Sequence, residues 1–234
     1  MTVHVHLLPT LFEPSHLTGG VAVMIDVLRA STTIVTALDH GAAAVIPHAT
    51  IDACRDAAAA AGGLTGGERG GLAIDGFDFG NSPASYAPAR VRGRDVHITT
   101  TNGTLAIAAM ADAEETLIGA FVNRDAVVDR LRGDARDVHL VCAGTDGQIT
   151  AEDILLAGAI ATDLLDVVRP VDPLSTQLAS QFYFATDDIR EAVRAGQGGR
   201  NLIRLGLDAD IDDALAESTL DIVPHLVDGR LTTA

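Results

Sequence analysis

The stretch that begins at Asp26 combines a carboxylate, an arginine and hydroxyl groups within a few residues. Asp26 directly follows the apolar run Val-Ala-Val-Met-Ile, and Arg29, Ser31 and Thr32 come soon after it. A carboxylate at the end of a buried strand is costly unless a cation or hydrogen bonds compensate it. Magnesium takes hard oxygen ligands of this kind, and a guanidinium binds phosphate or sulfonate through paired hydrogen bonds. We therefore predict Asp26 as a catalytic magnesium ligand, Arg29 as a catalytic residue, and Ser31 and Thr32 as substrate-binding residues.

A second polar stretch runs from Thr100 to Thr104 and reads Thr-Thr-Asn-Gly-Thr. A helical pattern follows it, and the free backbone N–H groups at the start of a helix bind anions. Hydroxyls and the Asn102 amide donate hydrogen bonds to anionic oxygens, and a glycine allows close approach of a ligand. We predict a catalytic role for Asn102 and substrate-binding roles for Thr100, Thr101, Gly103 and Thr104.

Further candidates lie in a glycine-rich stretch at 62–82 and at the start of a helical pattern at 151–168. The 62–82 stretch has no clear periodicity and reads as a long loop, and loops of this length in compact domains are more often functional than accidental. Its polar residues suit a loop that carries a metal ligand. The predicted magnesium ligands in this group are Glu68, Asp78 and Asp153, and the predicted substrate-binding residues are Arg69, Asn81 and Ser82.

Each candidate also has an ordinary structural explanation. The hydroxyls at 31–33 could serve only as helix N-caps, and Thr150 with Asp153 fits a capping box. Asp26 could form a buried ion pair with Arg29 instead of binding a metal. The glycine-rich stretch could be a solvated loop without function.

The elements that must position these residues alternate between strand and helix. Apolar or alternating runs predict strands at 3–8, 21–26, 44–47, 96–100, 116–121 and 138–144, and helical patterns lie at 32–40, 50–61, 103–111, 123–132 and 151–168. Such alternation indicates a mainly parallel sheet covered on both faces, in which ligands gather at the carboxyl ends of strands. Helical patterns fill most of 172–216, and 220–224 reads as a returning strand. We predict one three-layer α/β/α domain over 1–234, with a mixed, mainly parallel sheet, a helical C-terminal third and no internal repeat.

Composition limits the classes of partner. All 16 basic residues are arginine, against 32 acidic residues, and the net charge is −16. This charge excludes nucleic acid and anionic membrane surfaces as partners and is typical of salt-adapted proteins. The absence of lysine excludes a Schiff-base lysine and a phosphate-loop lysine. Two cysteines without metal-type spacing predict buried free thiols, and the lack of a membrane span or signal-like start predicts a cytoplasmic protein.

Five stretches of the sequence, taken in order, resemble the ComB family of 2-phosphosulfolactate phosphatases. They are IDVLRASTTIVTAL, LTGGERGGLAIDGFDFGNSP, ITTTNGTLAI, VCAGTDGQITAEDILLAGAI and GRNLIRLGLDADID with the later DIVP. The resemblance covers about residues 3–225. It implies a three-layer α/β fold, a homodimer, and magnesium-dependent hydrolysis of 2-phospho-3-sulfolactate to 3-sulfolactate and phosphate, a step of coenzyme M biosynthesis.

The matching positions do not imply an aspartyl-phosphate intermediate, because the first motif lacks the Asp-x-Asp-x-Thr signature of haloacid-dehalogenase phosphatases. We expect magnesium, held by Asp26 and one or two of the other candidate carboxylates, to polarise the phosphate and orient a water. Arg29 and Asn102 would stabilise the phosphoryl oxygens, and Arg69 would bind the sulfonate or carboxylate. The alternatives are a magnesium-dependent enzyme acting on another phosphorylated hydroxy acid or sulfonate, and a non-catalytic anion-binding domain.

Overall fold

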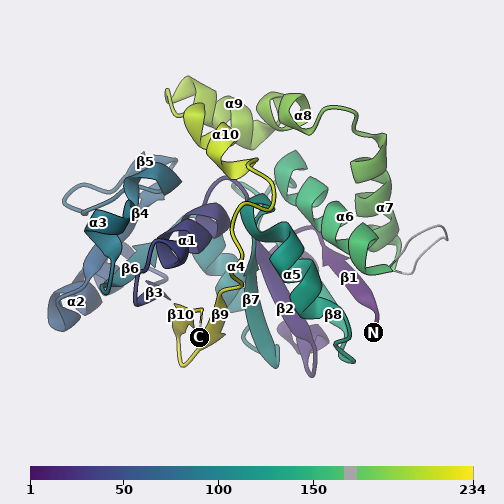
Figure 1. Ribbon diagram of the computed structural model, residues 1–234, viewed down its shortest axis with the longest axis horizontal. Helices are drawn as coiled ribbons and strands as arrows, with labels where there is room; N and C mark the ends of the chain where they lie inside the picture. The colour runs from purple at the N-terminus through teal and green to yellow at the C-terminus, as the bar shows by residue number, and fades with distance from the viewer. Residues whose placement is uncertain (166–172, 234) are drawn as a thin grey trace.

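The computed structural model describes residues 1–165 and 173–233. The strands in these ranges are β1 (Val3–His6), β2 (Val21–Ile25), β3 (Ala44–Pro47), β4 (Leu64–Arg69), β5 (Leu72–Ala73), β6 (Asp95–Thr99), β7 (Glu115–Gly119), β8 (Val138–Cys142), β9 (His225–Val227) and β10 (Arg230–Thr232). They form one mixed sheet in the order β1-β8-β2-β7-β9-β10-β3-β6-β4-β5 (Figure 1). The predicted mixed, mainly parallel sheet is therefore confirmed.

Helices cover both faces of this sheet. The α-helices of the described ranges are α1 (Ala30–Asp39), α2 (Ile51–Ala61), α3 (Pro88–Val91), α4 (Gly103–Ala109), α5 (Arg124–Leu131), α6 (Ala151–Leu165), α7 (Leu174–Ala185), α8 (Ile189–Ala195), α9 (Gln197–Arg204) and α10 (Ala209–Ala214). The helical C-terminal third is confirmed by α7 to α10. The last part of the helix predicted at 151–168 lies outside the described residues.

The central strand β2 shows the three layers most directly, because side chains alternate between the two faces of a strand. Val21, Val23 and Ile25 pack with α5 and α6 in one apolar cluster. Ala22 and Met24 pack with α1 and α4 in a second cluster on the other face. All five side chains are fully buried, which is why the run is uniformly apolar instead of alternating.

A hairpin near the C-terminus joins two parallel groups of strands. The strands β1, β8, β2 and β7 are parallel to one another, as are β3, β6 and β4. The hairpin β9–β10 lies between the groups and pairs antiparallel with β7 and with β3 (Figure 1). The returning strand predicted at 220–224 is thus displaced to 225–232. Pro224 lacks an N–H donor, although its carbonyl still accepts the N–H of Ile118.

The two parallel groups repeat a three-strand pattern that the sequence analysis missed. Residues 94–99 read Arg-Asp-Val-His-Ile-Thr and residues 136–141 read Arg-Asp-Val-His-Leu-Val. Val138 of β8 pairs with β1 on one side and β2 on the other, and Val96 of β6 pairs in the same way with β3 and β4. The prediction of no internal repeat is therefore wrong, because only the short central strand of each group preserves the similarity in sequence.

The stretch 62–82, predicted as a loop, contains the strands β4 and β5. Its glycines hide the strand signal because they replace the apolar residues that alternation requires. A Cβ at Gly67 would lie 1.9 Å from the carbonyl oxygen of Thr99, and a Cβ at Gly66 would lie 2.2 Å from the Tyr86 hydroxyl. The glycines therefore allow β4 to approach its neighbours closely.

The structure also bears on the predictions about the two cysteines and about membrane-spanning segments. Cys54 and Cys142 are both buried free thiols, as predicted. None of the helices in the described ranges is both long and apolar enough to cross a membrane. That residues 1–234 form a single domain stays a prediction.

Candidate functional site

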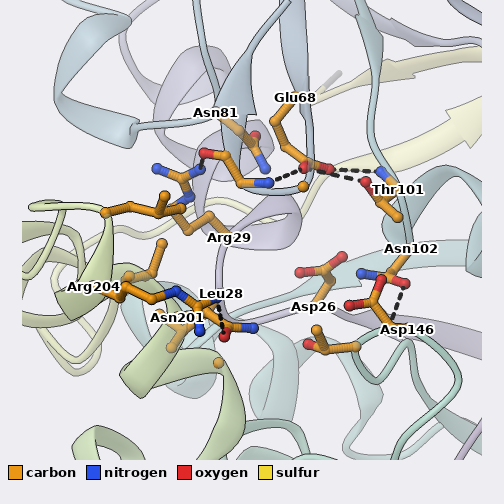
Figure 2. Close-up of a pocket in the computed structure, with 16 residues that line it drawn as sticks. Asp26, Leu28, Arg29, Glu68, Asn81, Thr101, Asn102, Asp146, Asn201 and Arg204 are labelled. Carbon is orange, nitrogen blue, oxygen red and sulfur yellow. Dashed lines mark hydrogen bonds between the residues drawn. The ribbon is translucent and has the colours of Figure 1, made fainter.

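The polar stretches that follow β2, β4, β6 and β8 converge on one cavity of about 220 Å³ (Figure 2). Helix α9 contributes the remaining wall. The carboxyl ends of parallel strands meet at one edge of a sheet, which brings these segments together. The residues that line the cavity are Asp26, Leu28, Arg29, Glu68, Gly70, Gly71, Asn81, Thr101, Asn102, Thr145, Asp146, Gly198, Asn201, Leu202, Arg204 and Leu205.

Asp26 is the most buried acid that lines this cavity, with 6% of its surface exposed. Its Oδ1 accepts the backbone N–H of Ala30 at 3.1 Å, while Oδ2 accepts no hydrogen bond from any residue that the structure describes. Burial, reinforced by the nearby carboxylate of Asp153, raises the pKa of Asp26 to about 8. A Cβ at Gly103 would lie 2.9 Å from Oδ2. Gly103 is thus needed to make room for the Asp26 carboxylate and does not itself line the cavity.

Arg29 lines the cavity but does not pair with Asp26. Its Nη1 lies 2.5 Å from Oδ2 of Asp210, and both side chains are almost fully buried. Its Nη2 donates to the carbonyl oxygen of Gly71 at 2.7 Å. The alternative in which Asp26 pairs with Arg29 is therefore wrong. Asp210 also accepts the hydroxyl of Ser82 at 2.5 Å, so that Ser82 supports the ion pair and does not line the cavity.

Glu68 holds two parts of the cavity wall together. Its Oε1 accepts the backbone N–H of Thr101 at 2.6 Å, and its Oε2 accepts the backbone N–H of Gly71 at 2.7 Å and the Thr101 hydroxyl at 3.1 Å. Next to it, Oδ1 of Asn102 accepts the backbone N–H of Asp146 at 3.2 Å. These hydrogen bonds, drawn in Figure 2, fix the predicted residues Glu68, Thr101 and Asn102 around the cavity.

Asn81 is the fourth amide or carboxylate that the sequence predicts and the structure places at the cavity. Only 4% of its surface is exposed, and its Oδ1 has no hydrogen-bond partner among the described residues. An unpaired buried amide oxygen is costly, which makes Asn81 a candidate for contact with a bound group.

Four predicted substrate-binding hydroxyls do not reach the cavity. The hydroxyls of Ser31 and Thr32 donate to backbone carbonyl groups five residues earlier, at 2.8 and 2.9 Å. Thr104 donates to the carbonyl of Thr100 at 2.8 Å, and the Thr100 hydroxyl accepts the backbone N–H of Thr104 at 3.2 Å. Their substrate-binding role stays a prediction, but in this structure all four hydroxyls are engaged with nearby backbone groups. Serine and threonine in the first turn of a helix readily bond to nearby backbone, and here the structural explanation holds.

Two of the four predicted magnesium ligands also lie outside the lining of the cavity. Asp78 is exposed, and its Oδ2 accepts both the backbone N–H and the hydroxyl of Thr65 at 2.8 Å. Asp153 is buried, and its two oxygens accept the N–H groups of Val27 and Gly144 at 2.9 Å each. Asp153 therefore ties the ends of β2 and β8 together, which is a structural role.

Arg69, predicted to bind the sulfonate or carboxylate, does not line the cavity either. Its Nη2 donates to the Thr99 hydroxyl at 2.9 Å, and its Nη1 donates to the carbonyl of Glu68 at 2.7 Å. Strand alternation explains the difference, because neighbouring residues of β4 point to opposite sides. Glu68 lies on the cavity side, so Arg69 turns away from it.

Several residues of the site were missed or left without a role. Asn201 and Arg204 of α9 line the cavity, as does Asp146 after β8, and Asp210 holds Arg29. The stretch GRNLIRLGLDADID, which carries part of the family resemblance, contains three of these four residues. That stretch was the feature of the sequence from which these three residues could have been found. The polar residues of this stretch could not be assigned to the cavity from the sequence, because the stretch follows the last crossover unit.

Glu152 is a further buried acid behind the wall formed by α9. Only 1% of its surface is exposed, and its Oε2 has no hydrogen-bond partner among the described residues. Burial, together with the charge of Asp26, raises the pKa of Glu152 above its usual range. A Cβ at Gly198 would lie 2.1 Å from Oε1. The glycine therefore lets α9 lie directly against this carboxyl group.

The lining residues fit a magnesium ion held by few protein ligands. Within residues 1–165 and 173–233, no group of three or more histidine, cysteine, aspartate or glutamate side chains is arranged to hold a metal. Magnesium, however, usually keeps several waters and binds one or two carboxylates together with substrate phosphate oxygens. Asp26, with its free Oδ2, and Glu68 line the same cavity and are the two carboxylates that would hold such an ion. A cation there would also relieve the cost of ionising a buried carboxyl group.

The charges around the cavity are separated. Figure 2 shows Arg29 and Arg204 on one side and Asp26 with Asp146 on the other. Glu68 lies at the top of this view. An anionic ligand with two acidic groups would therefore meet a cationic wall and a carboxylate wall.

Comparisons with known proteins show the family to which the chain belongs. A family model described as 2-phosphosulpholactate phosphatase matches residues 6–229. A protein of Deinococcus radiodurans named "Probable 2-phosphosulfolactate phosphatase" is 40% identical over 98% of this chain and 95% of its own length. Proteins with the same name from Clostridium beijerinckii (36% identity, 93% of each chain) and Symbiobacterium thermophilum (40% identity, 92% of this chain and 94% of the relative) are also similar. The chain therefore belongs to the 2-phosphosulpholactate phosphatase family.

Proposed function

We propose that the chain is a magnesium-dependent phosphatase that hydrolyses 2-phospho-3-sulfolactate to 3-sulfolactate and phosphate in this cavity. The observation that carries the proposal is the free Oδ2 of the buried Asp26 beside Arg29 and Asn102, in a family whose members carry this activity in their names. A site that only bound anions would not need a buried carboxylate at its floor, because a carboxylate repels them.

Some residues of the cavity would bind the metal, and others would bind the phosphoryl group of the substrate. Asp26, with Glu68 next to it, would hold the magnesium, which supplies charge neutralisation for the phosphoryl oxygens and orients a water. Arg29 and the Asn102 amide, which line the same cavity, would stabilise the charge that spreads over those oxygens. The Arg29 guanidinium stays in place because Asp210 and the Gly71 carbonyl bind two of its nitrogens. A positioned guanidinium loses little conformational entropy when the substrate binds.

The burial of Asp26 supports this division. Without a cation, the carboxyl group favours its neutral form near neutral pH. A divalent ion reverses that preference, since an opposite charge within a few ångströms stabilises the ionised form. The site is therefore expected to bind magnesium and phosphate together, and to bind either one alone more weakly.

A panel of phosphate esters tests the proposal. Purified protein would be assayed for phosphate release from 2-phospho-3-sulfolactate, other phosphorylated hydroxy acids and a generic aryl phosphate, with magnesium and with excess chelator. We expect turnover of 2-phospho-3-sulfolactate to be the fastest and to disappear with chelator. Asp78→Asn is a matched control, since Asp78 is an exposed acid outside the cavity, and it should retain activity within about twofold. Full activity in chelator would rule out the metal, and no turnover of any ester would rule out the phosphatase.

The homodimer, the cytoplasmic location and the role in coenzyme M biosynthesis expected from the sequence remain part of this proposal. Size-exclusion chromatography with light scattering at several protein concentrations tests the dimer. The acidic composition, with a net charge of −16, supports the salt-adapted interpretation, because repulsion between the acidic groups destabilises the folded chain at low salt.

A further inference from the structure

Resting on the proposed function, we propose that Arg204 and Asn201 of α9 bind the second acidic group of the substrate, the sulfonate or the carboxylate that accompanies the phosphate. They would then set the preference for phosphate esters that carry another anionic group. This role was expected for Arg69, whose guanidinium donates instead to Thr99 and to the backbone of Glu68.

Charge balance within the cavity points first to Arg204. Two arginines line the cavity, and the Asp210 carboxylate already neutralises Arg29 at 2.5 Å. Arg204 forms no ion pair with any residue in the part of the chain that the structure describes. The chain has 32 acidic residues for 16 arginines, so an arginine at a cavity that remains without a carboxylate is free to pair with an external anion.

The hydrogen bonds of Arg204 leave its binding edge open. Nη2 donates to the Oδ1 of Asn201 at 2.9 Å, which fixes the orientation of the guanidinium. The described residues accept no other hydrogen bond from this side chain, so Nε and Nη1 remain available. The amide nitrogen of Asn201 is a further donor. These three donor nitrogens belong to two residues that line the cavity, and their chemistry suits the oxygens of a sulfonate or carboxylate.

The helix that carries both residues is held in a fixed place. Asn201 and Arg204 are three residues apart and therefore lie on the same face of α9. Between them, Leu202 has only 4% of its surface exposed and belongs to the apolar core. At the start of the helix, Gly198 lies directly against the buried Glu152. Because both contacts anchor α9, its backbone does not need to be ordered again when a ligand binds.

The positions of the charged walls give the substrate an orientation. In Figure 2, Arg204 and Asn201 lie across the cavity from Asp26 and Asp146. A phosphoryl group at the Asp26 wall, with its magnesium, places the rest of the molecule toward α9. A phosphate ester without a second acidic group leaves Arg204 unused, and the cavity would then bind it less tightly.

Substrates that each lack one acidic group test this inference. Wild-type protein, Arg204→Gln and Asn201→Ala would be assayed with 2-phospho-3-sulfolactate, with 2-phospholactate (no sulfonate) and with the phosphate ester of 2-hydroxyethanesulfonate (no carboxylate). If Arg204 binds the sulfonate, Arg204→Gln should raise KM about 10- to 100-fold for the two sulfonates, the scale of one lost charged hydrogen-bond pair. Its kcat should stay within about threefold, and 2-phospholactate should change less than about twofold. If Arg204 binds the carboxylate, Arg204→Gln should instead leave the KM for the phosphate ester of 2-hydroxyethanesulfonate nearly unchanged, because that substrate has no carboxylate. Asn201→Ala should show the same pattern with a smaller loss.

The control for charge alone is Arg200→Gln, on the same helix but outside the cavity lining. It should leave all three substrates unchanged. Equal losses on every substrate with Arg204→Gln, or no loss on any, would overturn the inference.

Binding of 3-sulfolactate and of lactate, measured by calorimetry without turnover, separates the inference from the proposed function. If the wild type hydrolyses none of the esters but binds 3-sulfolactate at least tenfold more weakly after Arg204→Gln, the inference stands and the phosphatase proposal falls. Equal binding by wild type and variant would overturn the inference.

Discussion

Replacing Asp26 by asparagine tests the central residue of the site. The change removes one negative charge and keeps the shape of the side chain. An asparagine oxygen can still accept the backbone N–H of Ala30, now at 3.1 Å from Oδ1. The Arg29–Asp210 ion pair does not involve Asp26, so the substitution leaves no buried charge without its partner. The structure therefore separates the effect on catalysis from the effect on folding.

The expected effect on stability is a gain. Burial raises the pKa of Asp26 from its usual 3.8 to about 8. At pH 7 the unfolded chain therefore carries the ionised form, whereas the metal-free folded chain must take up a proton. Each pKa unit corresponds to about 1.4 kcal/mol, and the carboxyl group of Asp153 shares the effect. We therefore expect Asp26→Asn to stabilise the metal-free protein by on the order of 1–3 kcal/mol at pH 7. The gain should shrink as pH falls toward 4.

The expected effect on activity is a large loss. Asparagine provides no charge to hold magnesium beside the phosphoryl group. The loss of one strong electrostatic contact in an active site typically lowers turnover by about a hundredfold or more. Phosphate release with saturating magnesium and thermal unfolding without metal would be measured on the same preparation. A chain of this size shifts its melting temperature by roughly 2–4 °C per kcal/mol, so an increase of a few degrees is expected.

Two results would refute the reasoning about Asp26. If Asp26→Asn melts several degrees lower while each folded molecule keeps normal activity, Asp26 is a structural residue. If the variant loses activity but magnesium binding, measured by calorimetry in the presence of phosphate, is unchanged, Asp26 does not act as a metal ligand. Asp78→Asn on the same plate shows how much a change of one negative charge outside the cavity affects either measurement.

The remaining predictions concern packing, the buried ion pair, pH and salt. Gly103→Ala should lower the free energy of unfolding by about 1–3 kcal/mol and reduce phosphate release, because the added Cβ would lie 2.6 Å from a neighbouring methyl carbon; a variant as stable and active as wild type would contradict this. Asp210→Asn should cost about 3–5 kcal/mol in denaturant unfolding, since it leaves the buried Arg29 without its charge partner, and an unchanged midpoint would show that the pair is not needed. Burial and neighbouring imidazoles lower the pKa of His6 and of His139 to about 4. Because the unfolded chain takes up these protons near pH 6.5, the contribution of these two histidines to stability should be intact above about pH 7 and fall by on the order of 1–3 kcal/mol between about pH 6.5 and 4, while the raised pKa of Asp26 acts in the opposite direction. His139→Gln should flatten that slope. The melting temperature should rise from low to molar sodium chloride, since salt screens the repulsion of a net charge of −16; a flat or falling curve would contradict this.

The order of strands and helices could be predicted because it depends on local patterns. The uniformly apolar run at 21–25 indicates a strand buried on both faces, and the structure buries all five of its residues. The regular alternation with helices then requires a mainly parallel sheet. The strand at 64–69 could not be found in this way, because its glycines serve close contacts with Thr99 and Tyr86 and leave no apolar alternation.

The sequence by itself also brought Asp26, Thr101 and Asn102 to one site. Each of them lies at or just beyond the end of a parallel strand, and such ends meet at one edge of the sheet. The direction in which an individual side chain points could not be predicted from the sequence. The hydroxyl at Ser31 is two residues from a residue that lines the cavity, yet it bonds back to its own chain.

Only the tertiary structure decided the partners of the arginines. Arg29 pairs with Asp210, which is 181 residues away in the sequence, and Arg204 reaches the cavity from a helix that follows the last crossover unit. Arg69 is next to a cavity residue in the chain but turns away from the cavity with the alternation of its strand. Charge pairing depends on distances of a few ångströms between side chains. Those distances are set by the packing of elements remote in sequence, so no local pattern could have assigned them.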